Sequence, residues 1–272
     1  MGLGDTGVAS VGEVSAPPGE VVIAARGIGK AYGHVRALHD VSFDIRRGEV
    51  VAVFGDNGAG KSTLAKCLCG VETPDTGHVE IASHPVSMHS IRDAERYGIT
   101  AVHQDLALAP DLTVLENMFL GREVVATGWR GRLGMLSRGA MAVRSEAALA
   151  DLRIKLPSVR VQVAALSGGQ KQAVAVARGA MWSTSGILMD EPTAALGTRQ
   201  SDVVCELIRS TADRGLGVMV ISHDIPRILE VADRVIVLRH GSVALHALAG
   251  DANGRDIVDA MVGYHEHGGA QR

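Results

Sequence analysis

The chain has 272 residues, of which 46% are hydrophobic and 21% are charged. These values are typical of a globular protein with a sizeable core, and they exclude disordered and fibrous classes. The formal net charge is −3, so the chain has no overall basic field with which to neutralise nucleic-acid phosphates. We therefore expect no nucleic-acid partner.

The cysteines and the hydropathy pattern indicate a cytoplasmic protein. Cys67, Cys69 and Cys205 have neither zinc-ligand nor redox spacing, which favours packing roles in a reducing compartment. No apolar run is long enough to span a bilayer, and the first residues lack the pattern of a secretory signal.

The first half of the chain begins with an irregular stretch and continues as strands. Residues 1–18 are rich in Gly, Ser, Ala and Pro and have no helical or strand period, which predicts a flexible leader. Short β-rich runs follow at Val21–Ala25, Val41–Ile45 and Val50–Phe54. The folded part is thus expected to begin as a sheet.

The second half alternates unbroken apolar strands with helices. The strands are expected at Gly186–Met189, Val218–Ile221 and Val235–Leu238, and this pattern is typical of a parallel sheet covered on both faces. Between Leu106 and Leu166 no strand is expected. Apolar residues recur there at helical spacing, which predicts an inserted helical subdomain; they are Met141, Ala148, Leu149 and Leu152.

A phosphate-binding motif follows the strand Val50–Phe54 and precedes a helix. Its residues are Gly55, Asp56, Asn57, Gly58, Ala59, Gly60, Lys61 and Ser62, with Thr63 next. The glycines allow backbone N–H groups to wrap the phosphates of ATP, Lys61 reaches the β and γ phosphates, and Ser62 can ligate Mg²⁺. The alternative is a glycine-rich turn with a surface lysine, which the strand and helix on either side disfavour.

Two carboxylates end the apolar strand at Gly186–Met189. Asp190 and Glu191 would lie at the carboxyl edge of the sheet, where open α/β folds bind ligands. We expect Asp190 to hold Mg²⁺ and Glu191 to act as the general base that polarises the attacking water. The alternative is that the two carboxylates only make a surface loop soluble or cap a helix.

A histidine follows the strand Val218–Ile221 at the same edge. His223 would contact the γ phosphate and the water. Asp224 is expected to cap the helix that Pro226 helps to start. An incidental role for His223 is the alternative, and the neighbouring sites at this edge argue against it.

A serine and two glycines open an apolar-faced helix in the segment Leu166–Gln170. Its sequence is Leu-Ser-Gly-Gly-Gln, and the N–H groups at such a helix start form an anion site. The segment resembles the signature of ABC-type ATPases. This resemblance implies that Ser167, Gly168, Gly169 and Gln170 complete the nucleotide pocket of a second subunit in a head-to-tail dimer.

The resemblance covers about residues 21–263 and places further family motifs in order. It implies that Tyr32 stacks on adenine and that His223 is the switch histidine. It also implies that Gln104 joins the core to the helical subdomain and contacts nucleotide and metal. The expected fold is an α/β P-loop NTPase core with a mainly parallel sheet, an N-terminal antiparallel β subdomain and an inserted helical subdomain.

The resemblance also suggests the domain limits. The cassette is expected at residues 19–265, with its core at about 19–104 and 167–265 and its helical subdomain at about 105–166. Residues 266–272 form a polar tail. Catalysis is expected from Lys61, Glu191 and His223.

The stretch from Gln104 to Glu123 resembles the branch of the family that imports monosaccharides such as ribose, xylose and fructose. This implies a subunit on the inner face of the cell membrane that works with a permease and, indirectly, a sugar-binding protein. The stretch would border the groove that receives a coupling helix of the permease. Import of another small solute and a non-transport role in DNA repair or translation are the alternatives.

One position departs from the family pattern. After Thr193 the family generally reads Ser-Ala-Leu-Asp, whereas this chain reads Ala194, Ala195, Leu196 and Gly197. Gly197 cannot form a side-chain hydrogen bond across a dimer, which puts communication between two ATP sites in question. The partner cassette is expected to be a second copy of the chain or a distinct cassette.

Overall fold

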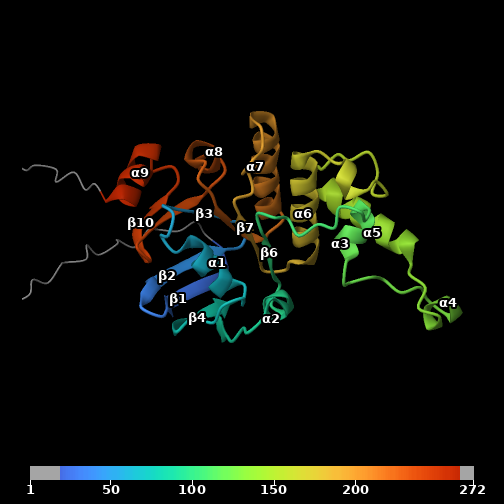
Figure 1. The fold of residues 1–272 in the computed structure, drawn as a ribbon, viewed down its shortest axis with the longest axis horizontal. Helices are drawn as coiled ribbons and strands as arrows, with labels where there is room; N and C mark the ends of the chain where they lie inside the picture. The colour runs from blue at the N-terminus through green and yellow to red at the C-terminus, as the bar shows by residue number, and fades with distance from the viewer. Residues whose placement is uncertain (1–18, 264–272) are drawn as a thin grey trace, which may run out of the picture.

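The computed structural model describes residues 19–263, and its centre is a six-stranded sheet (Figure 1). The strand order is β10-β9-β3-β8-β7-β6. Every neighbouring pair is parallel except β9 and β10. The bounds are β3 Val50–Gly55, β6 Ile99–Val102, β7 Gly186–Asp190, β8 Gly217–Ile221, β9 Arg234–Arg239 and β10 Ser242–Leu248.

A second sheet has four antiparallel strands in the order β2-β1-β4-β5. Their bounds are β1 Val21–Tyr32, β2 Val35–Arg46, β4 Thr76–Ile81 and β5 His84–Val86. This sheet and helix α1 (Lys61–Leu68) share one apolar core with one face of the six-stranded sheet, where β3 contributes Val51 and Val53.

Helices cover the other face of the six-stranded sheet (Figure 1). They are α6 Gly168–Trp182, α7 Thr198–Asp213, α8 Ile225–Leu229 and α9 Gly254–Val262. On this side β3 contributes Val50, Ala52 and Phe54 to a second core. Because both faces are buried, the strand reads as an unbroken apolar run rather than an alternating one.

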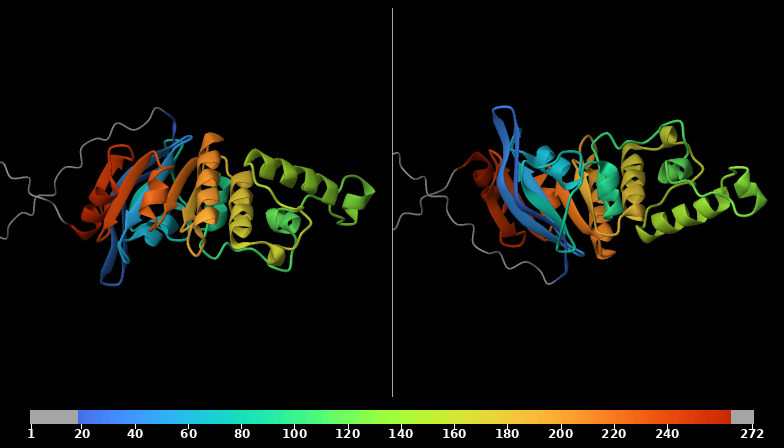
Figure 2. Two further views of the ribbon diagram at one scale, coloured as in Figure 1. Left: turned by 90° about the horizontal axis from the view of Figure 1, so that it is seen from above. Right: turned by 90° about the horizontal axis from the view of Figure 1, so that it is seen from below.

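The helical part of the chain lies beyond α6, at the end of the molecule farthest from α9 (Figures 1 and 2). It contains α3 Val114–Phe119, α4 Trp129–Arg132 and α5 Arg138–Asp151, whereas α2 Ile91–Arg96 precedes β6. The α5 helix buries Met141, Ala148 and Leu149, three of the residues whose spacing predicted it.

The predicted fold class is confirmed. The sequence located six strands, although β1 and β2 are longer than expected, and it missed β4, β5, β6 and β10. Strands β4, β5 and β10 carry many exposed or half-exposed residues, so no unbroken apolar run marks them. The predicted leader and polar tail lie outside the described residues, and the domain limits stay a prediction.

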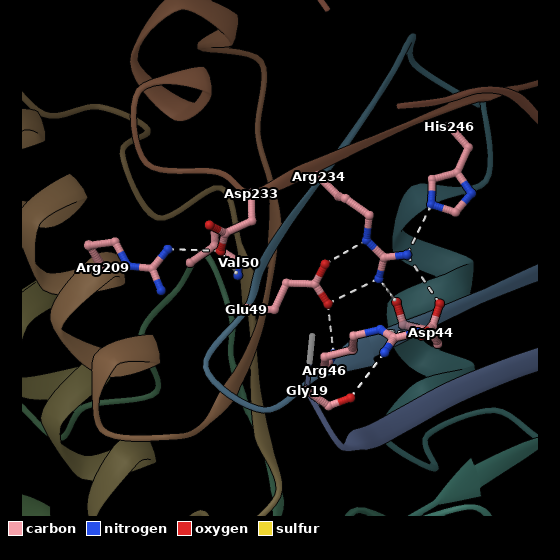
Figure 3. Close-up of polar contacts among 9 residues, drawn as sticks. All are labelled: Gly19, Asp44, Arg46, Glu49, Val50, Arg209, Asp233, Arg234 and His246. Atoms are coloured by element: carbon pink, nitrogen blue, oxygen red, sulfur yellow. Dashed lines mark hydrogen bonds and ion pairs between the residues drawn. The ribbon is translucent and has the colours of Figure 1, made fainter. Parts of the chain in front are cut away.

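A buried arginine network ties both sheets together at the edge where β3 and β9 begin (Figure 3). Arg234 is 1% exposed; its Nε lies 2.5 Å from Glu49 Oε1, and its Nη1 donates to Asp44 Oδ1 at 3.1 Å. Burial and the adjacent Arg234 charge lower the pKa of His246. The guanidinium is thus matched by two carboxylates that lie 185 and 190 residues away from it in sequence.

Within the described residues, no helix is both long enough and apolar enough to cross a membrane.

Candidate active site

Strand order alone gathers the predicted site at one edge of the sheet. The strands β3, β8, β7 and β6 are consecutive parallel neighbours, with Val53 opposite Ile221, Ile221 opposite Asp190 and Met189 opposite Val102. Their carboxyl ends therefore lie side by side. The phosphate loop, His223, the Asp190–Glu191 pair and Gln104 follow these four ends.

Two glycines of the phosphate loop have backbone conformations that would be strained for any other residue. Gly55 has φ 155° and Gly60 has φ 105°. A Cβ at Gly55 would lie 2.5 Å from the Leu238 carbonyl oxygen, and one at Gly60 would lie 2.5 Å from that of Ala37. The loop therefore lies against β9 and β2, and it leads into α1 with Gly60 at the N-cap.

The side chain of Lys61 is held inside this loop. It is 7% exposed, and its Nζ donates to the carbonyl oxygens of Gly55 at 2.7 Å and Asp56 at 3.0 Å. Burial lowers the pKa of Lys61, while the carboxylates of Glu191, Asp56 and Asp190 raise it. Two backbone acceptors thus position the ammonium group within the phosphate loop.

Three predicted metal ligands line one cavity of about 820 Å³, namely Ser62, Gln104 and Asp190. No group of three His, Cys, Asp or Glu side chains that could hold a metal occurs in residues 19–263. Mg²⁺ does not need such a group, because it is usually held by one or two protein oxygens together with phosphates and water. The hydroxyl, amide and carboxylate of this cavity fit that requirement.

The predicted base and switch histidine lie together. Glu191 Oε1 is 3.2 Å from His223 Nε2; the Glu191 side chain is 17% exposed and that of His223 is 50% exposed. Burial raises the pKa of the Glu191 carboxyl, and the charges of His223 and Lys61 oppose the rise. The buried Glu191 Oε1 has no partner with full hydrogen-bond geometry in the described chain, so it remains able to accept a bond from water.

The backbone at Glu191 is unusual for a non-glycine residue. Its φ is 52°, and its N–H donates to the Ile221 carbonyl oxygen at 2.9 Å. This left-handed turn directly follows β7 and is tied to the neighbouring strand β8. Such a conformation costs free energy and is concentrated at functional sites.

The predicted capping bond of Asp224 is wrong. Asp224 occupies the N-cap position of α8, and Pro226 lies in the first turn, but the Asp224 side chain makes no cap hydrogen bond. Its Oδ2 instead accepts from Arg227 Nη1 at 2.7 Å. The carboxylate therefore pairs with a side chain of the same helix and not with the helix backbone.

The signature segment forms a capping box at the start of α6. Ser167 Oγ accepts from the Gln170 N–H at 3.3 Å, and Gln170 Oε1 accepts from the Ser167 N–H at 3.0 Å. A Cβ on Gly168 or Gly169 would lie 3.2 Å from Leu196 or Gln200, respectively, so this helix start packs closely on the start of α7. The residues that line the 820 Å³ cavity do not come from this segment.

Tyr32 and Gly197 lie on the surface of the single chain. Tyr32 is 42% exposed, with Lys30 Nζ 5.8 Å from its ring centre, so its ring is available for stacking. Gly197 is the N-cap of α7, and a Cβ there would meet no atom within 4 Å. The chain therefore has space for an aspartate at position 197.

One residue of this region was missed from the sequence. Arg178, on α6, donates from Nη1 to the Ala107 carbonyl oxygen and from Nη2 to that of Leu106. Both residues follow Gln104 and have left-handed conformations, with φ 45° and 58°. A lone arginine in an apolar helix gives no signal that it holds a loop 71 residues away.

A phosphate loop that opens a helix at the carboxyl edge of a parallel sheet, beside a strand ending in two carboxylates, defines a P-loop nucleotide hydrolase. The family model described as ABC transporter matches residues 38–194. The chain belongs to the ABC transporter family, and it is an ATP-binding and ATP-hydrolysing cassette of that family.

Similar proteins include two sugar-import subunits. The fructose import ATP-binding protein FrcA of Rhizobium meliloti is 42% identical over 91% of this chain and 96% of its own length. The xylose/arabinose import ATP-binding protein XylG of Sulfolobus acidocaldarius is 42% identical over 89% of this chain and 94% of its own length.

Solved structures of ABC cassettes share the fold. A dimeric bacterial ABC transporter cassette is 27% identical, covers 84% of this chain and 98% of its own, and has a TM-score of 0.67. A nucleotide-free cassette from an ABC transporter is 22% identical, covers 89% of this chain and 95% of its own, and has a TM-score of 0.73.

Proposed function

We propose that the chain energises the import of a monosaccharide through a membrane permease, by closure of a cassette dimer around ATP. The single observation that carries this proposal is the 42% identity to two sugar-import ATP-binding proteins over nearly their whole length. The edge of the sheet supplies groups suited to each step of hydrolysis.

In the proposed mechanism, the N–H groups of the phosphate loop and the Lys61 ammonium bind the phosphates. Ser62, Gln104 and Asp190 would hold Mg²⁺, which would supply positive charge to stabilise the reacting phosphates. The Glu191 carboxylate would accept a proton from the attacking water, and His223 would orient that water and the γ phosphate. Tyr32 would stack on adenine.

The second half of each site would come from another cassette. The capping box leaves the N–H groups of Gly168 and Gly169 at the start of a 15-residue helix, which is an anion site by geometry and by the helix dipole. Ser167 and Gly168 are exposed, so a second chain has access to them. We propose a homodimer, with a distinct second cassette as the alternative.

The test is ATP hydrolysis in a complex reconstituted with its permease in lipid vesicles. A sugar-loaded binding protein should raise the hydrolysis rate several-fold over the same protein without sugar. Sugars added singly would identify the substrate. Stimulation by a different small solute would favour the alternative importer, and stimulation by DNA or ribosomes instead would overturn the transport function.

A further inference from the structure

An apolar and basic projection at one end of the molecule has no role in the proposed ATP site. Residues 124–137, here called the tip segment, connect α3 to α5 and include α4. In Figure 1 and in both views of Figure 2, α4 lies at the end of the molecule remote from α9. The tip segment thus extends away from both sheets.

The tip segment exposes large apolar side chains. Trp129 and Leu133 are each 70% exposed. The Leu133 N–H donates to the Trp129 carbonyl oxygen at 3.3 Å, so these side chains lie one helical turn apart on the same face. Three further exposed apolar residues of the segment are Val125, Met135 and Leu136.

Backbone hydrogen bonds hold the tip segment in a defined shape. The Ala126 N–H donates to the Met135 carbonyl oxygen at 2.8 Å, and the Ser137 N–H donates to that of Val124 at 2.7 Å. Val125 and Leu136 form an antiparallel bridge. The two ends of the segment are therefore fastened together, with α4 at the far end of the loop.

The charge of the tip segment is of one sign. The segment contains Arg130 and Arg132 and no Asp or Glu, although the whole chain has a net charge of −3. Arg138, directly after the segment, pairs with Glu116 at 3.6 Å. Arg132 is exposed, and within residues 19–263 no carboxylate pairs with its side chain. Exposed Trp and Leu beside unpaired arginine is the composition of segments that lie in a membrane interface.

We propose that the tip segment docks on an anionic lipid surface, with Trp129 and Leu133 among the headgroups and the Arg132 side chain against the phosphates. Charge favours lipid over a permease loop as the partner. Cytoplasmic loops of membrane proteins carry an excess of Lys and Arg and would repel this segment, whereas anionic headgroups attract it. The inference goes beyond the proposed function, since it requires no permease.

The test uses the purified chain and vesicles of two compositions, pure phosphatidylcholine and a mixture with about one third phosphatidylglycerol. We expect sedimentation with the anionic vesicles to be about tenfold stronger and to weaken as salt screens the charges. Trp129 emission should shift to shorter wavelength on binding. Trp182 donates to Met118 inside the fold and should be unaffected.

Two variants locate the contact. A double variant, Trp129→Ser with Leu133→Ser, and a single variant, Arg132→Glu, should each lose most anionic-vesicle binding. Matched controls are Val203→Ser, an exposed apolar residue of α7, and Arg96→Glu, an exposed arginine of α2. Basal ATP hydrolysis should be unchanged in all four, which shows that they are folded.

Three results would overturn the proposal. They are an absence of sedimentation with anionic vesicles, equal sedimentation with neutral vesicles, and binding that survives both tip variants. If the tip variants kept vesicle binding but no longer co-purified with the permease, the tip segment would dock on protein instead. None of these results would affect the proposed transport function, which is measured by sugar-stimulated hydrolysis.

Discussion

Arg178 Nη1 lies 2.7 Å from the carbonyl oxygen of Ala107, and this contact joins the signature helix to the loop after Gln104. Burial lowers the pKa of Arg178. The same helix begins at the signature segment. A movement of α6 therefore acts directly on the backbone beside the cavity that Gln104 lines.

We predict that Arg178→Ala loosens this loop. The loss of two hydrogen bonds from a charged donor should lower the free energy of unfolding by about 2 kcal/mol. The amides of Leu106 and Ala107, which donate to nearby backbone carbonyls, should exchange hydrogen faster. Unchanged exchange at these amides would show that Arg178 does not hold the loop. Arg96→Ala, at an exposed arginine, is the control.

A second prediction concerns the buried network of Figure 3. Replacing Arg234 by Met leaves Glu49 buried without its main partner, and breaking a buried pair in this way costs about 3–5 kcal/mol. Chemical denaturation should show this loss. ATP hydrolysis per folded molecule should change little at low temperature, because the network lies where β3 and β9 begin. A small stability loss would mean that water reaches Glu49.

The raised pKa of Glu191 predicts how stability and activity depend on pH. The ionised carboxylate destabilises the fold above its folded pKa, and this penalty disappears as pH falls through that pKa toward the unfolded value. Glu191→Gln should therefore be more thermostable than the wild type at pH 8, by a margin that vanishes near pH 4. A constant margin would contradict this. Hydrolysis should fall below the same raised pKa, since the base must be ionised.

A shared site between two chains can be tested by mixing inactive variants. Lys61→Ala removes the phosphate ligand, and Gly168→Asp places a carboxylate at the anion site of α6. Each homodimer should be inactive. If the two variants are mixed in equal amounts and exchange chains freely, about half of the dimers contain one chain of each kind. Each mixed dimer has one intact site of two, so the mixture should regain about a quarter of wild-type activity. No regain would argue against a site built from two chains.

Much of the site was predictable because its residues occupy fixed positions next to strands. Gly55, Asp190 and His223 follow apolar runs, and parallel strands bring such positions to one edge. The unusual φ of Glu191 was not predictable, since nothing in the sequence signals a left-handed glutamate. It depends on the bond from its N–H to Ile221 on the neighbouring strand.

Contacts between residues far apart in the chain also could not be predicted from the sequence. Arg234 is the first residue of an apolar strand, where an arginine is commonly expected to reach water. Its burial requires Glu49 and Asp44, which approach it only after both sheets have packed. The capping bond of Asp224 was also wrongly predicted, since its carboxylate pairs with Arg227, three residues on, and makes no bond to the helix backbone.

We propose that Glu191 is the base that drives ATP hydrolysis in a site shared by two chains. The most direct measurement compares ATP binding, hydrolysis and oligomeric state in the wild type and Glu191→Gln. The variant should bind ATP as the wild type does, lose at least about 100-fold in turnover, and accumulate as an ATP-bound dimer. Hydrolysis at the wild-type rate would show that Glu191 is not the base.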